Sequence, residues 1–349
     1  TMLRTLIFAL IVALVVSTKI LQEDHHTGFK WSEIIEAVNQ PGSTWTASVP
    51  TRFENATIAD VKKMLGTIMP GEEGYQGAAV EKTEFSALSV PDSFDVRTNW
   101  PNCAPITGHV RDQSSCGSCW AFGSTEAFND RYCISTGDAS TLFSAEDTAA
   151  CCSGYKCMFS NGCNGGQPAG AWDWFTKTGV VSGGDYADVG TGDSCQPYTL
   201  ESCAHHVSPP PGMVACDTLP EYPTPKCTSQ CEANYAVSFE KDKHYATQSY
   251  SVKGVSNMQQ ELMTYGTLSV AMTVYEDFEA YSGGVYVHKT GKNLGGHAIK
   301  MVGWGVDNGT PYWTCVNSWN DTWGEKGTFR ILRGSNECGI EGSVVAGNV

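Results

Sequence analysis

The stretch Gln113–Phe122 reads QSSCGSCWAF and places two cysteines, Cys116 and Cys119, three positions apart. Beyond it, small or apolar residues recur at helical spacing, at Ala121, Thr125, Phe128 and Tyr132. This pattern predicts a helix with one buried stripe, and Cys119 lies at its N-terminus. A helix N-terminus favours a thiolate, because its partial positive charge and unpaired N–H groups stabilise an anion. Cys119 is therefore a candidate nucleophile.

The second half of the chain is rich in strand patterns. Ala298–Val302, Tyr312–Val316 and Thr328–Leu332 read as strands, and Asn308-Gly309 between the first two is a hairpin signal. Since the first half looks helical, we expect an α+β chain of two subdomains with a cleft between them.

A nucleophilic thiolate also needs a base, a residue that orients the base, and donors for the oxyanion. His297 in GGHAI is predicted to open a strand, and Asn317 in NSW to end the next one, where it can accept from the imidazole. Trp319 can shield that bond from water. Gln113 lies upstream in the same tight loop as Cys119 and can aim its amide at an oxyanion. Taken singly, a buried cysteine is usually inert and such a histidine usually structural.

Composition excludes several classes of function. The 349 residues carry a formal net charge of −15, and Lys and Arg form no run, which argues against a nucleic-acid surface and an anionic-membrane surface. A solvated acidic exterior explains the charge, which also suits an acidic compartment. Nothing in the sequence suggests a metal, a nucleotide or another cofactor.

The N-terminus predicts secretion. Arg4 precedes the apolar run Leu6–Val16, which is shorter than the about 20 residues of a membrane span, so residues 1–17 read as a signal peptide. Fifteen cysteines then imply an oxidising compartment and disulfides, and their odd number leaves at least one thiol unpaired or joined to another chain. We expect the secretory pathway, with a lysosomal or acidic endosomal destination or export. Three sequons are candidate glycosylation sites: Asn55, Asn308 and Asn320.

Residues 18–89 contain no cysteine and carry two helical patterns, Trp31 to Val38 and Ile58 to Leu65. This segment is a propeptide or a small accessory domain, and the interpretation as a propeptide is preferred. All cysteines lie between Cys103 and Cys338. Residues 195–231, with many prolines and no periodicity, predict a long surface loop held by disulfides.

CGSCWAF with its upstream glutamine, GGHAI and NSW together resemble the papain-like cysteine peptidases. The resemblance implies a helical left domain and a β-barrel-like right domain over residues 90–349. It implies catalytic roles for Cys119, His297, Asn317 and Gln113, with peptides and proteins as substrates. It also implies inhibition by the chain's own propeptide, cystatin-type inhibitors as partners, no membrane span and a monomer.

The interval from Cys119 to His297 exceeds the about 130 to 150 residues usual in the family, so an insertion is expected. Cys203-Ala204-His205-His206, followed by prolines and Cys216, resembles the occluding loop of the cathepsin B-like subgroup. There, two histidines capture the substrate's C-terminal carboxylate, which implies peptidyl-dipeptidase besides endopeptidase activity. A metal-binding or merely exposed histidine pair is the alternative.

The resemblance also implies six disulfides: Cys103–Cys133, Cys116–Cys163, Cys151–Cys227, Cys152–Cys157, Cys195–Cys231 and Cys203–Cys216. Cys116 would then be a structural brace and Cys119 the nucleophile. Further substrate contacts would come from Gly165, Gly166, Trp319 and Ser343. Cys315 has no assigned role beyond that of a small buried residue.

The sequence departs from the subgroup's pattern at three places. Ser114 replaces a usual glycine, which can shift the oxyanion donors slightly. The loop has no arginine between Cys203 and Cys216, and Thr322 stands where its acidic partner is expected, which predicts a loop that opens easily. Ser343 replaces an acidic residue of the S2 pocket, which predicts apolar P2 side chains. A catalytically silent papain-like binding protein and a disulfide-rich structural protein are the rival hypotheses.

Overall fold

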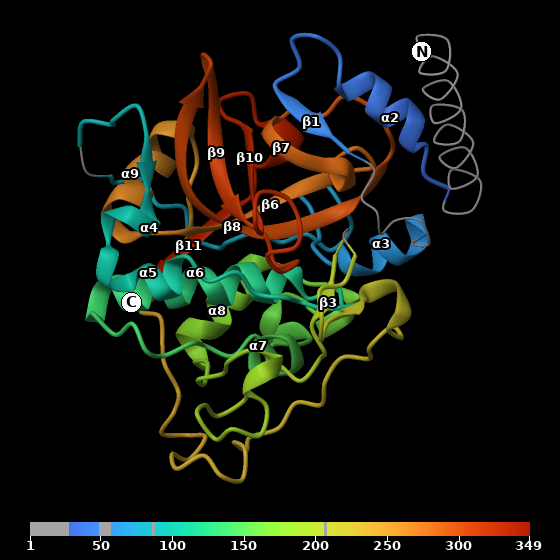
Figure 1. Cartoon of the computed structure of the whole chain (residues 1–349). Coiled ribbons are helices and arrows are strands. Elements are labelled where there is room, and N and C mark those ends of the chain that lie inside the picture. Colours follow the sequence, from blue (N-terminus) through green and yellow to red (C-terminus); the bar gives the residue numbers. More distant parts are fainter. Residues whose placement is uncertain (1–27, 49–56, 86–87, 206–207) are drawn as a thin grey trace.

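A computed structural model describes residues 28–48, 57–85, 88–205 and 208–349. The signal-peptide prediction, His206 and Asn55 lie outside these residues. Figure 1 shows a sheet built largely from the C-terminal part of the chain, with helices of the first half packed below it. The α+β architecture with two unlike halves is confirmed.

Within the residues that the structure describes, the sheet contains nine strands. Along the path their order is β1 (Trp45–Ala47), β7 (Tyr281–Tyr286), β10 (Thr328–Leu332), β9 (Thr310–Val316), β8 (Asn293–Asp307), β6 (Leu268–Tyr275), β11 (Val344–Asn348) and β5 (Gln248–Ser251), and β2 (Phe94–Asp95) pairs with β8. The path ends at β1 and β5, so within the described residues the sheet is not a closed barrel. The expectation of a barrel-like right domain is corrected to an open, curved sheet with two edges.

The predicted strands are present. β10 has the predicted extent, β9 starts at Thr310, two residues before the predicted Tyr312, and Asn308-Gly309 forms the β8–β9 turn with positive φ at both residues. β8 is longer than predicted and starts at Asn293, so His297 lies inside the strand and does not open it. The start of β8 was not predicted, because Gly295 and Gly296 weaken the strand pattern of the sequence.

The central helix is α6, Cys119–Thr136. It lies between β8 and the helix α8 (Pro168–Lys177), and it is buried on nearly every side, not along the single stripe predicted. The remaining helices are α2 (Trp31–Val38), α3 (Ile58–Met64), α4 (Val96–Asn99), α5 (Ala104–Thr107), α7 (Ala145–Cys151) and α9 (Val255–Tyr265). Short 3-10 turns are η1 (Pro101–Cys103), η2 (Tyr155–Cys157), η3 (Gly162–Asn164), η4 (Tyr186–Asp188), η5 (Cys216–Thr218), η6 (Phe278–Ala280) and η7 (Glu337–Gly339).

Two hydrophobic cores correspond to the two halves. One joins Trp120, Phe128 and Trp172 of the helical half, and the other lies under the sheet around Trp304 and Trp319. The sheet core also contains residues of the N-terminal segment, Trp31, Ile34, Val38 and Trp45. The N-terminal segment is therefore packed onto the sheet, not tethered loosely to it.

Both predicted helices of the N-terminal segment are present, as α2 and α3. The segment also contains β1, which pairs with β7 at the edge of the sheet. The indole of Trp45 donates to the carbonyl of Val287 at 2.8 Å. Across the described ranges, no helix combines the length and apolar character that crossing a membrane requires.

Candidate active site

Cys119 is the first residue of α6 and is completely buried. Burial raises the pKa of its thiol, but the charge of His297, with hydrogen bonds from His297 and Thr67, lowers it by more, from 9.0 to about 7. The other free cysteines differ: burial alone raises the pKa of Cys315, and burial with nearby carboxylates raises that of Cys338. Cys119 is thus the one free cysteine prepared to form a thiolate.

His297 is held by Asn317 across the β8–β9 hairpin. Nε2 of His297 lies 2.7 Å from Oδ1 of Asn317, and the same oxygen accepts the Ser318 N–H at 2.8 Å. The ring of Trp319 lies 4.8 Å from the imidazole ring and is itself buried. With Nε2 engaged, Nδ1 is the nitrogen left for the thiol, so Asn317 fixes both the tautomer and the ring orientation.

Gln113 is fully buried and oriented by Ser318. Its backbone N–H donates to the Ser318 carbonyl at 2.9 Å, and its Oε1 accepts the Ser318 hydroxyl at 2.7 Å. Its Nε2 then donates to the carbonyls of Cys116, at 2.8 Å, and Met64, at 2.9 Å. The Met64 carbonyl belongs to the N-terminal segment, so its departure would leave an amide N–H of Gln113 for an oxyanion.

Ser114, at a position where the family usually has glycine, adopts a left-handed backbone conformation with φ at +58°. Its N–H donates to Asp112 at 2.8 Å and its hydroxyl donates to the carbonyl of Glu201. These two bonds offset the roughly 1–2 kcal/mol that a left-handed non-glycine residue costs. The neighbouring Gln113 is held by its own hydrogen bonds to Ser318, Cys116 and Met64, and the effect of Ser114 on the oxyanion donors stays a prediction.

The N-terminal segment runs in extended form between the two halves, directly over Cys119. Thr67 donates to the Gly296 carbonyl at 3.0 Å, and Gly166 donates to the Gly66 carbonyl at 2.7 Å. The hydroxyl of Thr67 lies 3.2 Å from the Cys119 sulfur. The hydroxyl of Thr67 therefore contacts the thiol, and the segment covers Cys119.

Glycines allow this close approach. A Cβ on Gly165 would lie 2.8 Å from the carbonyl oxygen of Gly66, and one on Gly296 would lie 2.1 Å from that of Thr67. The buried Met69 side chain lies between Gly296 and Gly339. An unbranched apolar side chain therefore occupies the space beside these two glycines.

Ser343 is buried, and its carbonyl accepts a hydrogen bond from the backbone N–H of Ala271 in β6 at 3.0 Å. The nearby carboxylate of Glu341 does not substitute for a missing acid, since it accepts from the indole of Trp313 at 2.9 Å and from backbone N–H groups of Gly334 and Asn336. The sequence prediction of an S2 position without an available carboxylate is consistent with these contacts.

Comparison with known proteins agrees with this geometry. The sequence profile described as papain family cysteine protease matches residues 90–348. The chain belongs to the papain family of cysteine proteases. It is 47% identical over 325 residues to cathepsin B-like cysteine proteinase 5 of Caenorhabditis elegans, covering 90% of this chain and 89% of that one. It is 45% identical to proteinase 6 of the same organism, covering 90% and 82%.

Solved structures of papain-family zymogens share the fold. Procathepsin B S9 from Trypanosoma congolense superposes with a TM-score of 0.75 at 32% identity, covering 90% of this chain and 97% of that one. Procathepsin L2 of Tenebrio molitor gives a TM-score of 0.65 at 25% identity, covering 95% and 93%. The resemblance to a cathepsin B-like cysteine protease made as a zymogen is thus confirmed.

The cathepsin B-like insertion is anchored on Asp112. Its carboxylate accepts from the backbone N–H of Cys203 at 2.9 Å and lies 3.1 Å from Nε2 of His205. His205 is buried and its ring is stacked 6.0 Å from that of Trp319. The insertion therefore contacts Trp319, the residue that covers the catalytic histidine. Its short strands β3 (Cys203–Ala204) and β4 (Val214–Ala215) pair in parallel.

Where the sequence lacks the usual arginine–acid pair, Thr322 and Asn320 bind the insertion by hydrogen bonds. The hydroxyl of Thr322 accepts from the His205 N–H at 3.3 Å and lies 3.4 Å from the His205 carbonyl. The amide of Asn320 donates to Asp112 at 2.9 Å and also to the Cys203 carbonyl. The Thr322 contacts are neutral, whereas those to the Asp112 carboxylate are charge-assisted and stronger, so the easy opening of the loop stays a prediction.

The structure joins twelve cysteines in the six pairs that the resemblance implied, including Cys116–Cys163 and Cys203–Cys216. Cys203, His205 and Cys216 lie within 4.8 Å of one another, which is a spacing for a metal. The disulfide removes the two thiolates that a metal would need, so this group does not fit a metal site.

Several residues of the site escaped the sequence analysis. The sequence analysis named Thr322 only as the residue in place of an acid, although its hydroxyl contacts the His205 backbone. Thr67 and Ser318, which contact Cys119 and Gln113, were not predicted at all. Each is a common hydroxyl residue with no diagnostic spacing. Ser318 alone had a signal, since it is the middle residue of the NSW motif.

Proposed function

We propose that the chain is a cathepsin B-like peptidase that hydrolyses peptide bonds through an acyl-Cys119 thioester, with endopeptidase and peptidyl-dipeptidase activity. The observation that carries the proposal is the convergence of a low-pKa thiol, an imidazole held by Asn317 and a fixed amide donor from Gln113. These are the parts that acyl transfer by a thiolate requires.

The reaction follows from the roles of these groups. The Cys119 thiolate attacks the scissile carbonyl, and the oxyanion takes the Gln113 amide N–H that Met64 holds in the zymogen. The His297 imidazolium then protonates the leaving amine. Neutral His297 next removes a proton from water, which hydrolyses the thioester and restores the thiol pair. Asn317 keeps the imidazole oriented without adding a charge.

The peptidyl-dipeptidase part of the proposal rests on His205 and His206. Imidazolium groups near the primed side of the cleft would bind a substrate's C-terminal carboxylate at acidic pH, since the ordinary histidine pKa is about 6.5. The contacts of His205 with Asp112 and with Trp319, whose ring also lies near that of His297, support this part of the proposal. The capture of a carboxylate fixes the cut two residues from the C-terminus.

Further parts of the proposal concern the precursor. Residues 1–17 would be a signal peptide, residues 18–89 a removable propeptide and residues 90–349 a monomeric mature peptidase of the secretory pathway, lysosome or acidic endosome, open to cystatin-type inhibitors. Among the described sequons we place a glycan at Asn308, which is exposed in the β8–β9 turn. Asn320 is a poor acceptor, because its amide is buried and donates to Asp112 and Cys203.

The specificity proposal is a preference for apolar P2 side chains. Met69 fills a pocket between Gly296 and Gly339, and Ser343 brings no carboxylate to it. A P2 arginine would lose its hydration without gaining a partner. We expect Phe-Arg reporters to be cleaved much faster than Arg-Arg reporters, and comparable values of kcat/KM would refute this preference.

The decisive experiment uses one internally quenched peptide, prepared as the free acid and as the C-terminal amide, from about pH 4.5 to 7.5. Acid-matured protein should release a dipeptide from the free acid alone at low pH and cut both forms internally as the pH rises. Cys119→Ala should do neither. Equal internal cleavage of both forms at every pH would remove the dipeptidase proposal. No cleavage at any pH would favour the catalytically silent binding protein.

A further inference from the structure

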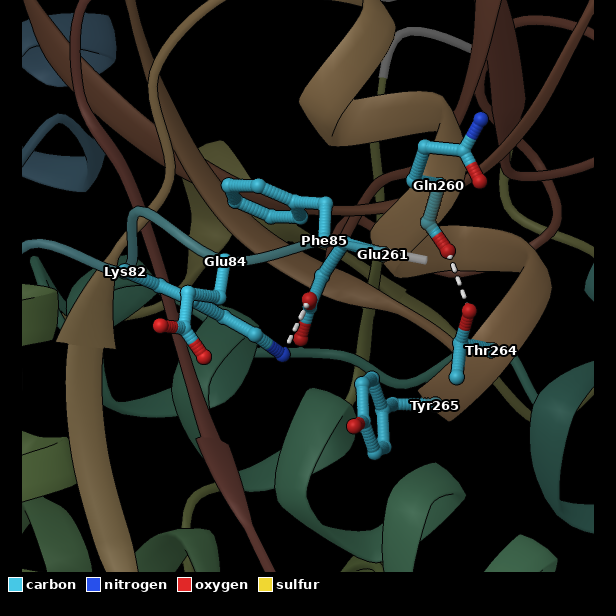
Figure 2. Close-up of a pocket in the computed structure, with 7 residues that line it drawn as sticks. All are labelled: Lys82, Glu84, Phe85, Gln260, Glu261, Thr264 and Tyr265. Carbon is cyan, nitrogen blue, oxygen red and sulfur yellow. Dashed lines mark hydrogen bonds and ion pairs between the residues drawn. The ribbon is translucent and has the colours of Figure 1, made fainter. Parts of the chain in front are cut away.

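The propeptide places one lysine in a pocket of the mature half that lies outside the catalytic site. Nζ of Lys82 donates to Oε2 of Glu261 on α9 at 2.8 Å, and Figure 2 shows this contact among the side chains that line the pocket. The Glu261 side chain is fully buried, and 17% of the Lys82 side chain is exposed. The ammonium is therefore held largely out of water.

Aromatic rings complete the lysine pocket. Nζ of Lys82 lies 4.0 Å from the ring centre of Tyr265 and 4.8 Å from that of Tyr250. Phe85 of the propeptide is a third ring, at 5.5 Å. A cation over two or three rings gains electrostatic attraction that adds to its ion pair. Tyr250 and Tyr265 belong to residues 90–349 and remain after the propeptide is removed.

The backbone beside Lys82 is held as an added strand. Ser251 of β5 donates to the Val80 carbonyl at 2.8 Å, and Lys82 donates to the Ser251 carbonyl at 3.0 Å. β5 is the last strand on its side of the sheet, so this edge takes an extended peptide by strand addition. The main chain supplies general affinity and the lysine pocket supplies selectivity.

Removal of the propeptide leaves this site built but unfilled. Oε1 of Glu261 accepts from the Arg131 guanidinium at 3.0 Å and from the Tyr250 hydroxyl, and both partners remain after the propeptide is removed. Oε2 has Lys82 as its hydrogen-bond partner among the described residues. Loss of Lys82 would leave a buried carboxylate oxygen facing a cavity rimmed by two tyrosine rings, and burying an unpaired charged oxygen is costly.

We infer that the mature enzyme carries at β5 and α9 a binding site for the lysyl side chain of an extended segment in a protein substrate. The inference rests on the proposed removal of residues 18–89. An extended lysine-bearing segment reproduces each contact of Val80 to Lys82. Residues 90–349 carry a formal net charge of −12 of the full chain's −15, which favours basic partners over acidic ones. Such an exosite would raise the cleavage of lysine-rich proteins above that of small reporters.

The test uses the peptide AAVEKTEF, residues 78–85, as a fluorescent probe for mature enzyme whose Cys119 has been blocked by a thiol-directed epoxide. Fluorescence anisotropy should detect binding. Replacement of the lysine by norleucine, which keeps the stem and removes the charge, should weaken binding at least about tenfold. Equal binding of both peptides, or no binding at about 1 mM, would overturn the inference.

Matched tyrosine variants locate the site. Tyr265→Leu removes a ring that is 40% exposed and should weaken the probe about three- to tenfold, whereas Tyr245→Leu, at an exposed tyrosine outside the pocket, should not. Both variants should cleave a small reporter like wild type. Equal probe affinities of the two variants would contradict the assignment of the pocket.

A competition arm separates substrate binding from simple rebinding of the propeptide. Free AAVEKTEF should slow cleavage of an unfolded lysine-rich polypeptide by unblocked mature enzyme and leave the small reporter unaffected. Inhibition of neither substrate, despite binding, would overturn the role in substrate capture. Reporter activity of the same preparation is measured first, so absence of peptidase activity would be recognised as failure of the proposed function and not of the exosite.

Discussion

Gly66→Ala should release the propeptide from the catalytic cleft. A Cβ on Gly66 would lie 1.8 Å from the carbonyl oxygen of Gly117 and 2.6 Å from its carbonyl carbon. Gly66 is absent from the residues with positive φ, so alanine has no backbone penalty there and the clash alone decides the effect. The opposing backbone does not yield easily, because Gly117 donates to the Cys163 carbonyl at 3.1 Å.

The magnitude follows from the bonds that the displaced segment would lose. Relief of the clash requires a shift of more than about 1 Å, which breaks three backbone hydrogen bonds: Gly166 to Gly66 at 2.7 Å, Thr67 to Gly296 at 3.0 Å, and Ile68 to Gly166 at 3.1 Å. At about 0.5–1.5 kcal/mol each, the loss is about 1.5–4.5 kcal/mol. The opening equilibrium of the cleft should therefore rise by about 10- to 2000-fold.

The assay is the rate at which a small thiol-directed epoxide labels Cys119 in the unprocessed zymogen near neutral pH. The labelling rate should rise with the opening equilibrium in Gly66→Ala and stay unchanged in Lys62→Ala, a change at an exposed neighbouring position. Mature enzyme prepared from the wild-type, Gly66→Ala and Lys62→Ala precursors should have the same kcat/KM, because the mature chain contains neither Gly66 nor Lys62. A labelling rate for Gly66→Ala within about twofold of wild type would refute the reasoning.

Three other predictions address stability, catalysis and the insertion. Burial raises the pKa of Glu126 from 4.5 to about 7 and that of Asp130 from 3.8 to about 6, with partial compensation by neighbouring cations. Between about pH 4 and pH 7 the folded state binds more protons at these two carboxyl groups than the unfolded state does. Their contribution to the free energy of unfolding is therefore complete below about pH 4 and decreases as the pH rises toward 7. The Tm should be higher at pH 5 than at pH 7.5, Glu126→Gln should reduce the difference, and equal Tm values would contradict it. Asn317→Ala removes the acceptor of His297 and should lower kcat/KM by roughly 10- to 100-fold, with a much smaller change in Tm; an unchanged kcat/KM would exclude the orienting role. Thr322→Val removes the hydroxyl that contacts the His205 backbone and should raise endopeptidase relative to dipeptidase turnover, and an unchanged ratio would exclude this clasp.

Local patterns predicted the elements whose stability is local. The helix from Cys119, the strands β9 and β10 and the Asn308-Gly309 turn have periodicities or turn residues that a short window reveals. The all-round burial of α6 was not predictable in this way, because its second face packs on β8, far along the chain. The open ends of the sheet likewise depend on the pairing of distant strands.

The catalytic residues were recognisable because their motifs are specific, whereas their supporting contacts were not. Thr67 reaches Cys119 from 52 positions earlier in the chain, and Thr322 reaches His205 from 117 positions later. No spacing rule connects such pairs, because the folded path between them sets their distance. Lys82 is a similar case, since its partner Glu261 lies 179 positions away.

The most direct test of the central claim is a stoichiometric labelling of mature protein with a thiol-directed epoxide at about pH 6, followed by peptide mass spectrometry. The account predicts one label per chain on Cys119, none on Cys315 or Cys338, whose pKa values burial raises, and loss of hydrolysis in proportion to labelling. Full hydrolysis by completely labelled protein, or a label on another cysteine that abolishes hydrolysis, would contradict it.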